Sequence, residues 1–403
     1  MERRVGQGVK ATVVGAGITG ITTAYYLYKA GYDVTVFDKE PYAGMKTSYA
    51  NGGQLSVSNS ETWTSWSNVV KGLKWMLKSD APFLIRPSLS PSKIKWLTAF
   101  LYETCKGEDN RRRNSMSTVA MGLLAREEYY RIADETGINF DLSKKGILHF
   151  YKNAEYFDNA KYAMESIYRY TDLKREVVLA QEVPKLEPKL AGVEGIIGGI
   201  WTESDSVGDI HKFCSELANW LSNRGVRFQY NVDFDSAFTE GMGFHYDNVV
   251  ICAGADSAYV AGLFNESINV YPVKGYSITI KDDPKYYPTT SLLDDEAKIV
   301  TSTLGDRFRV AGTAELDGWN LDIRKDRIDP LLRWVHTNFP DIDTRDYKPW
   351  AGLRPMTPSM MPIVRRGVSK GVYLNTGHGH LGWTLSPSTA QMVVQLIDQD
   401  NKG

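Results

Sequence analysis

The sequence predicts an α/β fold in which a parallel-sheet domain is interrupted by a second domain of α+β character. A strand, a glycine loop, a helix and a second strand open the chain over residues 9–37. A near-continuous apolar strand at 248–255 is typical of a parallel sheet covered on both faces. Segments of a different pattern interrupt this α/β rhythm twice. We expect a discontinuous parallel-sheet domain over 1–85, 175–265 and 346–403, and a second domain with an antiparallel sheet over 86–174 and 266–345.

The opening loop has the glycine spacing of a dinucleotide-binding unit. Its residues are Gly15, Ala16, Gly17, Ile18, Thr19 and Gly20. Gly15 permits the tight turn, Gly17 lets the backbone approach a pyrophosphate, and Gly20 lets helix and strand pack closely. The helix N-terminus offers free N–H groups to the phosphates. Asp38, with Lys39 beside it, follows the second strand, where an acid can accept a hydrogen bond from a ribose. The unit predicts an adenine dinucleotide.

Bulk composition excludes several classes of protein. The chain has 403 residues, 42% hydrophobic and 24% charged, with a formal net charge of -1. There is no strong nucleic-acid signal and no apolar run near the roughly 20 residues of a spanning helix. The three cysteines form no CxxC, and no metal is expected. A polar start leaves no room for a signal peptide before the first strand. We therefore expect a cytoplasmic protein.

Periodicity and capping signals predict the remaining elements. Loops are expected from 346, because glycine and proline are frequent there. Ser386 as N-cap and Pro387 at the first helical position indicate where the last helix begins. Residues 111–113 are three arginines expected on a solvated helix face. The expected helices are 118–135, 209–222, 330–338 and the last from 387; the expected strands are 146–151, 227–230, 270–280, 301–312 and 371–375.

Two later segments point to FAD as the dinucleotide. Cys252-Ala253-Gly254-Ala255 places small residues at the carboxyl end of a parallel strand, where nucleotides lie in open α/β sheets. The glycine-rich stretch 376–384 leads into the last helix, whose N-terminus can stabilise negative charge on a reduced flavin. An NAD dehydrogenase does not need this second element. A long FAD, bound noncovalently, does.

These and other motifs carry a family resemblance. The sequence resembles the D-amino acid oxidase/glycine oxidase superfamily of FAD enzymes, and most closely its D-amino acid dehydrogenase branch. The opening loop is shared widely, whereas the last two motifs in order are much more specific. The matching stretches are 13–20, 47–56 (TSYANGGQLS), 271–277 (YPVKGYS), 350–358 (WAGLRPMTP) and 375–384 (NTGHGHLGWT).

The resemblance implies a Rossmann-like FAD-binding domain and a substrate domain, and it implies roles for individual residues. Val232 falls where such enzymes contact adenine through the backbone, and Ala253 and Gly254 would line the cofactor cleft. The loop expected near the ribityl chain and isoalloxazine comprises Thr47, Ser48, Gly52, Gly53, Gln54 and Leu55. The residues expected to close on the flavin ring are Gly379, His380, Leu381, Gly382, Trp383 and Thr384.

Arg354 is the candidate for binding substrate. A guanidinium pairs bidentately with a carboxylate and fixes its orientation. His378 and Tyr276 are the further candidates for the active site. Histidines 378 and 380 can equally be structural or contact the ring, and Tyr276 can equally be sheet packing.

The function that the resemblance implies is oxidative deamination of an amino acid, most readily a D-amino acid. Hydride passes from Cα to flavin N5, and the imino acid hydrolyses to a 2-oxo acid and ammonia. Two alternatives stay open: an oxidase of glycine or an N-substituted glycine, including a glycyl-type group on a modified nucleotide, and a flavin protein that binds an amino acid without turnover. The expected electron acceptor is a quinone or oxygen.

Residues 63–105 bear on the partners of the protein. Tryptophans 63, 66, 75 and 96 occur here among several lysines. Aromatic and basic residues together can form an interfacial helix, so peripheral contact with the cytoplasmic membrane is one reading. A capping subdomain whose tryptophans fill its own core is the other. The oligomeric state is left open.

Overall fold

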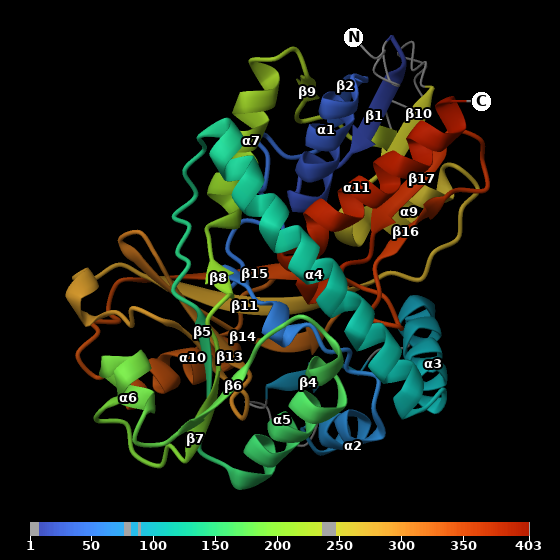
Figure 1. Cartoon of the computed structure of the whole chain (residues 1–403). Coiled ribbons are helices and arrows are strands. Elements are labelled where there is room, and N and C mark those ends of the chain that lie inside the picture. The colour runs from blue at the N-terminus through green and yellow to red at the C-terminus, as the bar shows by residue number, and fades with distance from the viewer. Residues whose placement is uncertain (1–7, 76–81, 88–89, 236–246, 403) are drawn as a thin grey trace.

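The computed structural model describes residues 8–75, 82–87, 90–235 and 247–402. Its smaller sheet has six strands in the order β16-β17-β10-β1-β2-β9 (Figure 1). All neighbouring pairs are parallel except β16 with β17. This is the Rossmann-like arrangement that the sequence predicted. The strands are β1 (Lys10–Val14), β2 (Asp33–Phe37), β9 (Arg227–Gln229), β10 (Asn248–Ile251), β16 (Ile363–Arg366) and β17 (Val372–Thr376).

Helices cover both faces of this sheet, which explains why its central strands are mostly apolar. On one face α1 (Ile18–Ala30) packs between α7 (Ile210–Ser222) and α11 (Gly382–Asn401), with the long α4 (Glu108–Thr136) against α11. Figure 1 shows α4 crossing from the smaller sheet to the lower part of the molecule. On the other face α9 (Ser257–Gly262) packs against Val14 and Ile251. Asp209 caps α7, the helix expected over 209–222, by accepting from the Lys212 N–H.

The larger sheet has nine strands in the order β15-β11-β14-β13-β12-β5-β7-β6, with β4 pairing with β14. It is largely antiparallel, as predicted, and α10 (Lys325–Asn338) packs against β11 and β14. Its strands are β4 (Phe83–Ile85), β5 (Ile147–Tyr151), β6 (Glu176–Leu179), β7 (Gly198–Thr202), β11 (Tyr271–Ile280), β12 (Ser291–Asp294), β13 (Ile299–Leu304), β14 (Arg307–Leu316) and β15 (Tyr347–Met356). The remaining elements are α2 (Trp66–Trp75), α3 (Pro91–Cys105), α5 (Ala154–Ser166), α6 (Val183–Leu186), β3 (Gln54–Leu55), β8 (Ser206–Val207), η1 (Val57–Asn59), η2 (Tyr168–Tyr170), η3 (Pro188–Leu190), η4 (Gly254–Asp256), η5 (Pro284–Tyr286) and η6 (Gly379–Leu381).

Two expectations for the C-terminal segment are wrong. Residues from 346 form β15 rather than loops, paired with β11 over ten residues. The last helix begins at Gly382, so that Pro387 lies inside it and Ser386 is not its N-cap. Trp383 and Leu385 are buried in this first turn, and their packing outweighs the local signal at 386–387. Because β6, β7 and β15 belong to the larger sheet, the segments proposed at 175–265 and 346–403 contribute strands to both sheets.

The expectation that residues 111–113 all lie on a solvated helix face is wrong for Arg111. Arg113 is exposed, but the Arg111 side chain is only 13% exposed and contacts Glu108 and Glu61. The tryptophans of 63–105 divide between the two readings, because Trp96 is buried and Trp66 is 56% exposed. Within the segment 63–105, residues 76–81 and 88–89 lie outside the described residues.

Candidate active site

A cavity of about 1950 Å³ runs between the two sheets. This is roughly twice the upper end of ordinary small-ligand pockets, which leaves room for a dinucleotide and a substrate together. Most of the expected cofactor residues line it: Gly15, Gly17, Ile18, Thr19, Asp38, Lys39, Thr47, Ser48, Gly52, Gln54, Val232, Ala253, Gly254, Gly379, His380, Leu381, Gly382, Trp383 and Thr384. Four expected residues lie behind its wall: Ala16, Gly20, Gly53 and Leu55.

The glycines of the opening loop are required by close backbone contacts. A Cβ on Gly20 would collide with the Gly15 carbonyl oxygen, and one on Gly15 would collide with the Cys252 carbonyl. Gly17 is the N-cap of α1 and provides no side chain to cap the helix. Ser48 Oγ accepts from the Ile18 N–H at 3.2 Å, at the start of the helix. The N-terminus of α1 therefore faces the cavity with backbone donors, which fits a pyrophosphate.

The acid at the end of β2 orders the same loop. Asp38 accepts from the Ala16 N–H at 2.5 Å and from the Glu40 N–H at 2.8 Å. Burial raises the pKa of Asp38, while these two backbone hydrogen bonds oppose the rise. The neighbouring Lys39 pairs with Asp256 at 3.1 Å. The Val232 N–H donates to the Asp38 carbonyl at 3.1 Å, so an adenine contact here would rely on the Val232 carbonyl.

The loop 47–54 is held by the larger sheet. Thr47 Oγ1 donates to the Leu353 carbonyl at 2.6 Å, and Gln54 Nε2 donates to Ser291 Oγ at 2.8 Å. Ser277, Arg309 and Ser302 donate to the backbone carbonyls of residues 50, 51 and 52. All three of these carbonyls are bound by donors on the larger sheet. The opposite side of the loop is thereby presented to the cavity.

The opposite wall is the glycine-rich stretch between β17 and α11. Gly377 and Gly379 have positive φ angles of 75° and 58°, and a Cβ on Gly379 would meet Met356 Sδ at 2.7 Å. Helix α11 begins directly after this stretch, and its N-cap, Leu381, provides no side-chain capping hydrogen bond. The free N–H groups of a 20-residue helix therefore lie at the cavity, as predicted for the flavin end of an FAD site.

Arg354 reaches across the sheet floor from β15. Its guanidinium lies over Gly275 of β11, and its Nη1 donates to the Thr313 carbonyl at 3.2 Å. Thr313 is the extra residue of a bulge in β14 and has φ of 57°, which turns its carbonyl toward the guanidinium. Within the residues that the structure describes, no carboxylate lies within 4.0 Å of Arg354. Burial lowers its pKa to about 10, so it stays charged at neutral pH.

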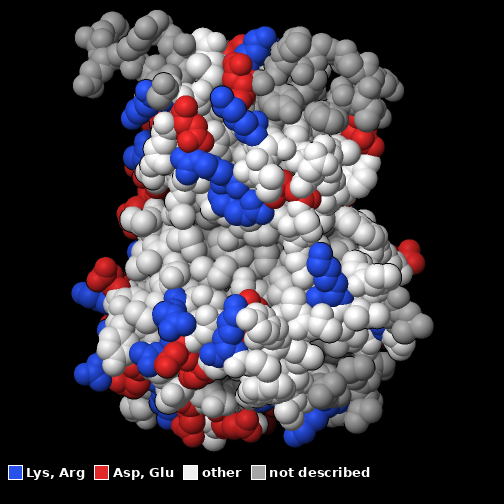
Figure 2. Space-filling model, turned by 90° about the vertical axis from the view of Figure 1, so that its right-hand side faces the viewer, with Lys and Arg blue, Asp and Glu red and all other residues white. Residues whose placement is uncertain are grey.

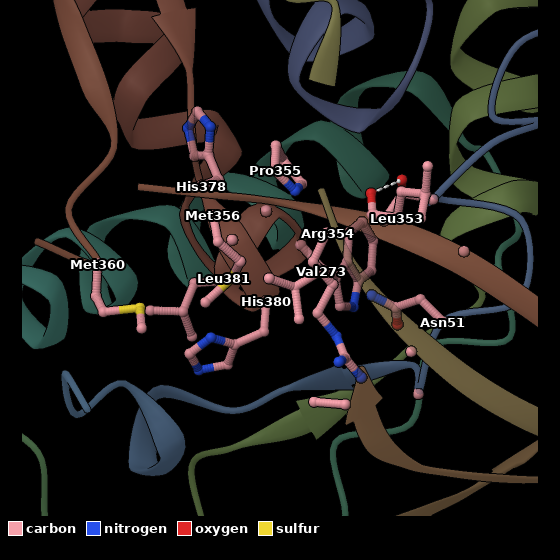
Figure 3. A pocket seen from close by; sticks show the side chains of 18 of the residues that line it. Asn51, Val273, Leu353, Arg354, Pro355, Met356, Met360, His378, His380 and Leu381 are labelled. Carbon is pink, nitrogen blue, oxygen red and sulfur yellow. Dashed lines mark hydrogen bonds between the residues drawn. The ribbon is translucent and has the colours of Figure 1, made fainter. Parts of the chain in front are cut away.

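The two histidines of 376–384 have different surroundings. Figure 3 shows their rings pointing to opposite sides, with His380 on the side of Arg354 and Met360. His378 Nε2 is 2.8 Å from Thr389 Oγ1 in α11. His380 stacks on Trp63 with ring centroids 4.6 Å apart. Burial lowers the pKa of each to about 3, and the Arg354 charge contributes for His380, so both are neutral near pH 7.

Tyr276 lies on the other face of the sheet from Arg354. Side chains alternate along a strand, so Gly275 and Ser277 face the cofactor loop while Tyr276 faces the core under α10. Its hydroxyl donates to Glu315 at 2.6 Å, and Glu315 also accepts from Arg86 at 2.9 Å. The role suggested for Tyr276 stays a prediction, and this geometry gives it a supporting position. Sequence reasoning did not place Gly275, Thr313 or Trp63 at the substrate site; a glycine inside an apolar strand was the one available signal.

The comparisons with known proteins agree with this geometry. A family model described as FAD dependent oxidoreductase matches residues 10–396. The chain belongs to this FAD-dependent oxidoreductase family. It is 46% identical to "D-amino acid dehydrogenase 3" of Mesorhizobium japonicum over 97% of both chains, and 36% identical to a D-amino acid dehydrogenase of Dechloromonas aromatica over 96% of this chain and 97% of the relative.

Solved structures share the fold at low identity. Glycine oxidase from Geobacillus kaustophilus has a TM-score of 0.73 at 20% identity, covering 97% of this chain and 94% of that one. Glycine oxidase from Bacillus cereus has a TM-score of 0.72 at 17% identity, covering 97% and 95%. FAD is therefore the dinucleotide for which the two helix N-termini and the long cavity are arranged.

Proposed function

We propose that the protein oxidises a D-amino acid, giving an imino acid that water converts to a 2-oxo acid and ammonia. The observation that carries the proposal is the buried, charged Arg354, which faces the cavity without an acidic partner among the described residues. A buried guanidinium needs an anion, and its planar fork fits a carboxylate. The near-full-length relatives named D-amino acid dehydrogenase support the choice of substrate.

The chain's own residues would orient the substrate. Arg354 holds the α-carboxylate beside the wall formed by Gly379 to Thr384, so the Cα–H faces the redox end of the cavity. FAD, when bound, accepts two electrons with the hydrogen from Cα. The amine must be neutral for this step, and no acid–base dyad is needed if its proton is lost on binding. The neutral His380 near Arg354 adds no positive charge that would oppose an ammonium on entry.

An anaerobic flavin-reduction screen tests the proposal. The FAD-loaded protein is mixed with D-amino acids, L-amino acids, glycine, sarcosine and proline, and bleaching of the flavin is followed. D-amino acids should reduce the flavin fastest, and Arg354→Gln should weaken their binding. Equal or faster reduction by glycine or sarcosine would contradict the substrate class, and no reduction by any amine would contradict turnover. Reoxidation by oxygen and by a soluble quinone then identifies the acceptor.

We further propose that the face carrying α2 and α3 contacts the membrane surface peripherally. Five large apolar side chains on these helices are exposed: Trp66, Val70, Ile94, Leu101 and Tyr102. Lys74, Lys95 and Lys106 lie among or beside them and are also exposed. Figure 2 shows the side of the molecule that faces right in Figure 1, where an uncharged band crosses the middle and basic and acidic side chains lie below it. Apolar side chains flanked by lysines suit an anionic lipid surface.

Flotation with anionic liposomes tests this contact. The protein should float with the vesicles, and the pair Trp66→Ser and Tyr102→Ser should return it to the soluble fraction. Tyr162→Ser in α5, also 61% exposed, is the matched control and should not. An unchanged soluble fraction for the parent protein would remove the proposal. No helix of the described residues is long and apolar enough to cross a membrane.

A further inference from the structure

The floor of the cavity beyond Arg354 carries charged residues that the proposed deamination does not use. Strand pairing shows the row: Gly312 pairs with Ile299, Ile299 with Asp294, and Asp294 with Phe150. Lys298, Asp295 and Tyr151 are the chain neighbours of Ile299, Asp294 and Phe150. They therefore continue the same row across the sheet as Gly275 and Thr313, over which the Arg354 guanidinium lies. Asp295 is 2.7 Å from Lys298, and Tyr151 donates to it at 3.0 Å. All three line the cavity.

Arg175 stands at the far end of this floor. It lies just before β6, and three neighbours fix its guanidinium. Nε donates to Thr202 Oγ1 at 3.3 Å, Nη2 is 3.4 Å from His149 Nδ1, and the guanidinium is 4.5 Å from the centre of the Tyr168 ring. Burial lowers the pKa of His149 to about 3, so this imidazole is neutral and accepts from Arg175. The guanidinium is thereby held in a single, preorganised position.

Two ion pairs lie around Arg175, and neither includes it, although the Arg175 charge also acts on Glu61. Lys298 pairs with Asp295 at 2.7 Å, and Arg111 pairs with Glu61 at 3.6 Å. Across the described ranges, no carboxylate lies within 4.0 Å of the Arg175 guanidinium. Burial raises the pKa of Glu61, and the positive charge of Arg175 lies close enough to oppose this rise. Arg175 is thus a fixed cation in the cavity wall with no carboxylate in direct contact among the described residues.

We propose that Arg175 is a second anion subsite and that the substrate is an amino acid with a carboxylate at the far end of its side chain. The inference rests on the proposed function for the position of the α-carboxylate at Arg354. Arg354 contacts β14 and Arg175 contacts β5, three strands away, which is about 14 Å across the sheet. Subtracting about 3 Å for the hydrogen bond at each end leaves about 8 Å between the carboxylate oxygens. Glutamate to 2-aminopimelate spans this range.

Binding of simple acids to the FAD-loaded full chain tests the subsite without turnover. Adipate and hexanoate have the same carbon chain and differ in the second carboxylate. The flavin absorbance change, or calorimetry, gives the affinity of each. A charge-assisted hydrogen-bonded contact predicts that adipate binds about 10- to 100-fold more tightly than hexanoate. Equal affinities, or tightest binding by 6-aminohexanoate, whose far end is cationic, would overturn the proposal.

Two charge-neutralising variants should move the ratio of the two affinities in opposite directions. Arg175→Gln should bring the adipate-to-hexanoate ratio close to one, whereas Glu61→Gln should raise it by removing a nearby negative charge. FAD content checks that each variant is folded. A ratio that Arg175→Gln leaves unchanged would exclude Arg175 as the subsite. The wild-type ratio alone still decides the proposal if a variant fails to bind FAD.

Turnover distinguishes the two proposals. If D-amino acids reduce the flavin but D-2-aminoadipate has no advantage in kcat/KM over D-norleucine, the deamination stands and the subsite is wrong. If adipate is favoured through Arg175 but no amino acid reduces the flavin, the subsite stands and the deamination is wrong.

Discussion

Gly275→Ala is the sharpest test of how the sheet positions Arg354. A Cβ at this position would lie 2.8 Å from Nη1 of Arg354 and closer still to Nη2 and Cζ. Restoring ordinary contact moves the guanidinium by about 1 Å. A displacement of this size can cost about 100-fold in rate when it misplaces a substrate. The atoms that must move are the end of a flexible side chain, so the fold should be retained.

Stopped-flow reduction of the flavin measures this effect. Gly275→Ala should lower kcat/KM for a D-amino acid by about 100-fold, with normal FAD content and a melting temperature close to that of the parent. If the methyl group acts only through Arg354, it should cost nothing further in the Arg354→Ala background. An additive loss in the double variant, or full activity of Gly275→Ala, would refute this account of the substrate anchor.

Three further outcomes follow from the site. Asp38→Ala leaves the Ala16 N–H without its acceptor, so FAD should bind about 10-fold or more weakly, as measured by fluorescence titration. Asp38→Asn should lose less FAD affinity, because its amide oxygen can still accept this hydrogen bond. Burial lowers the pKa of His149 and His378 from 6.5 to about 3 in the folded protein. Between these two pH values the unfolded chain binds more protons than the folded protein. The contribution of these histidines to the free energy of unfolding is therefore fully present above pH 6.5 and is lost as the pH falls. The melting temperature should therefore fall between pH 7 and pH 5, and His378→Gln should flatten this slope; a slope unchanged by the variant would exclude His378 as a source. Activity itself should show no limb from His380 between pH 5 and 8, because its imidazole stays neutral there.

The parts of this molecule that sequence could predict are those fixed by local backbone requirements. Gly20 is dictated by a contact within one strand-loop-helix unit, since a Cβ there would meet the Gly15 carbonyl oxygen, and Gly15 is favoured by its positive φ of 108°. Asp209, at the start of a predicted helix, is a cap that acts over three residues. The apolar strand β10 is readable because both of its faces are covered. In each case the signal itself lies within one short stretch of sequence.

The errors came from context that lies elsewhere in the chain. β15 contains Pro349, Gly352 and Pro355 and was expected to be a loop, yet it is the edge strand of the larger sheet, where missing N–H donors are tolerated. The bulge at Thr313 has no local marker, because a threonine at positive φ is unusual. The charged floor combines β5, β12, β13 and the residue before β6, and only strand pairing reveals that these segments are neighbours.

The hydrogen bonds of the loop 47–54 show why the cofactor site and the substrate site form one unit. Thr47 is bound to the carbonyl of Leu353, the residue immediately before Arg354. Ser277 and Ser302, on two other strands of the same sheet, bind the loop carbonyls at 50 and 52. A movement of the sheet floor therefore displaces the cofactor loop and the guanidinium together. These bonds tie the proposed carboxylate anchor to the cofactor loop through the larger sheet, whereas the proposed subsite at Arg175 contacts β5, three strands away from β14.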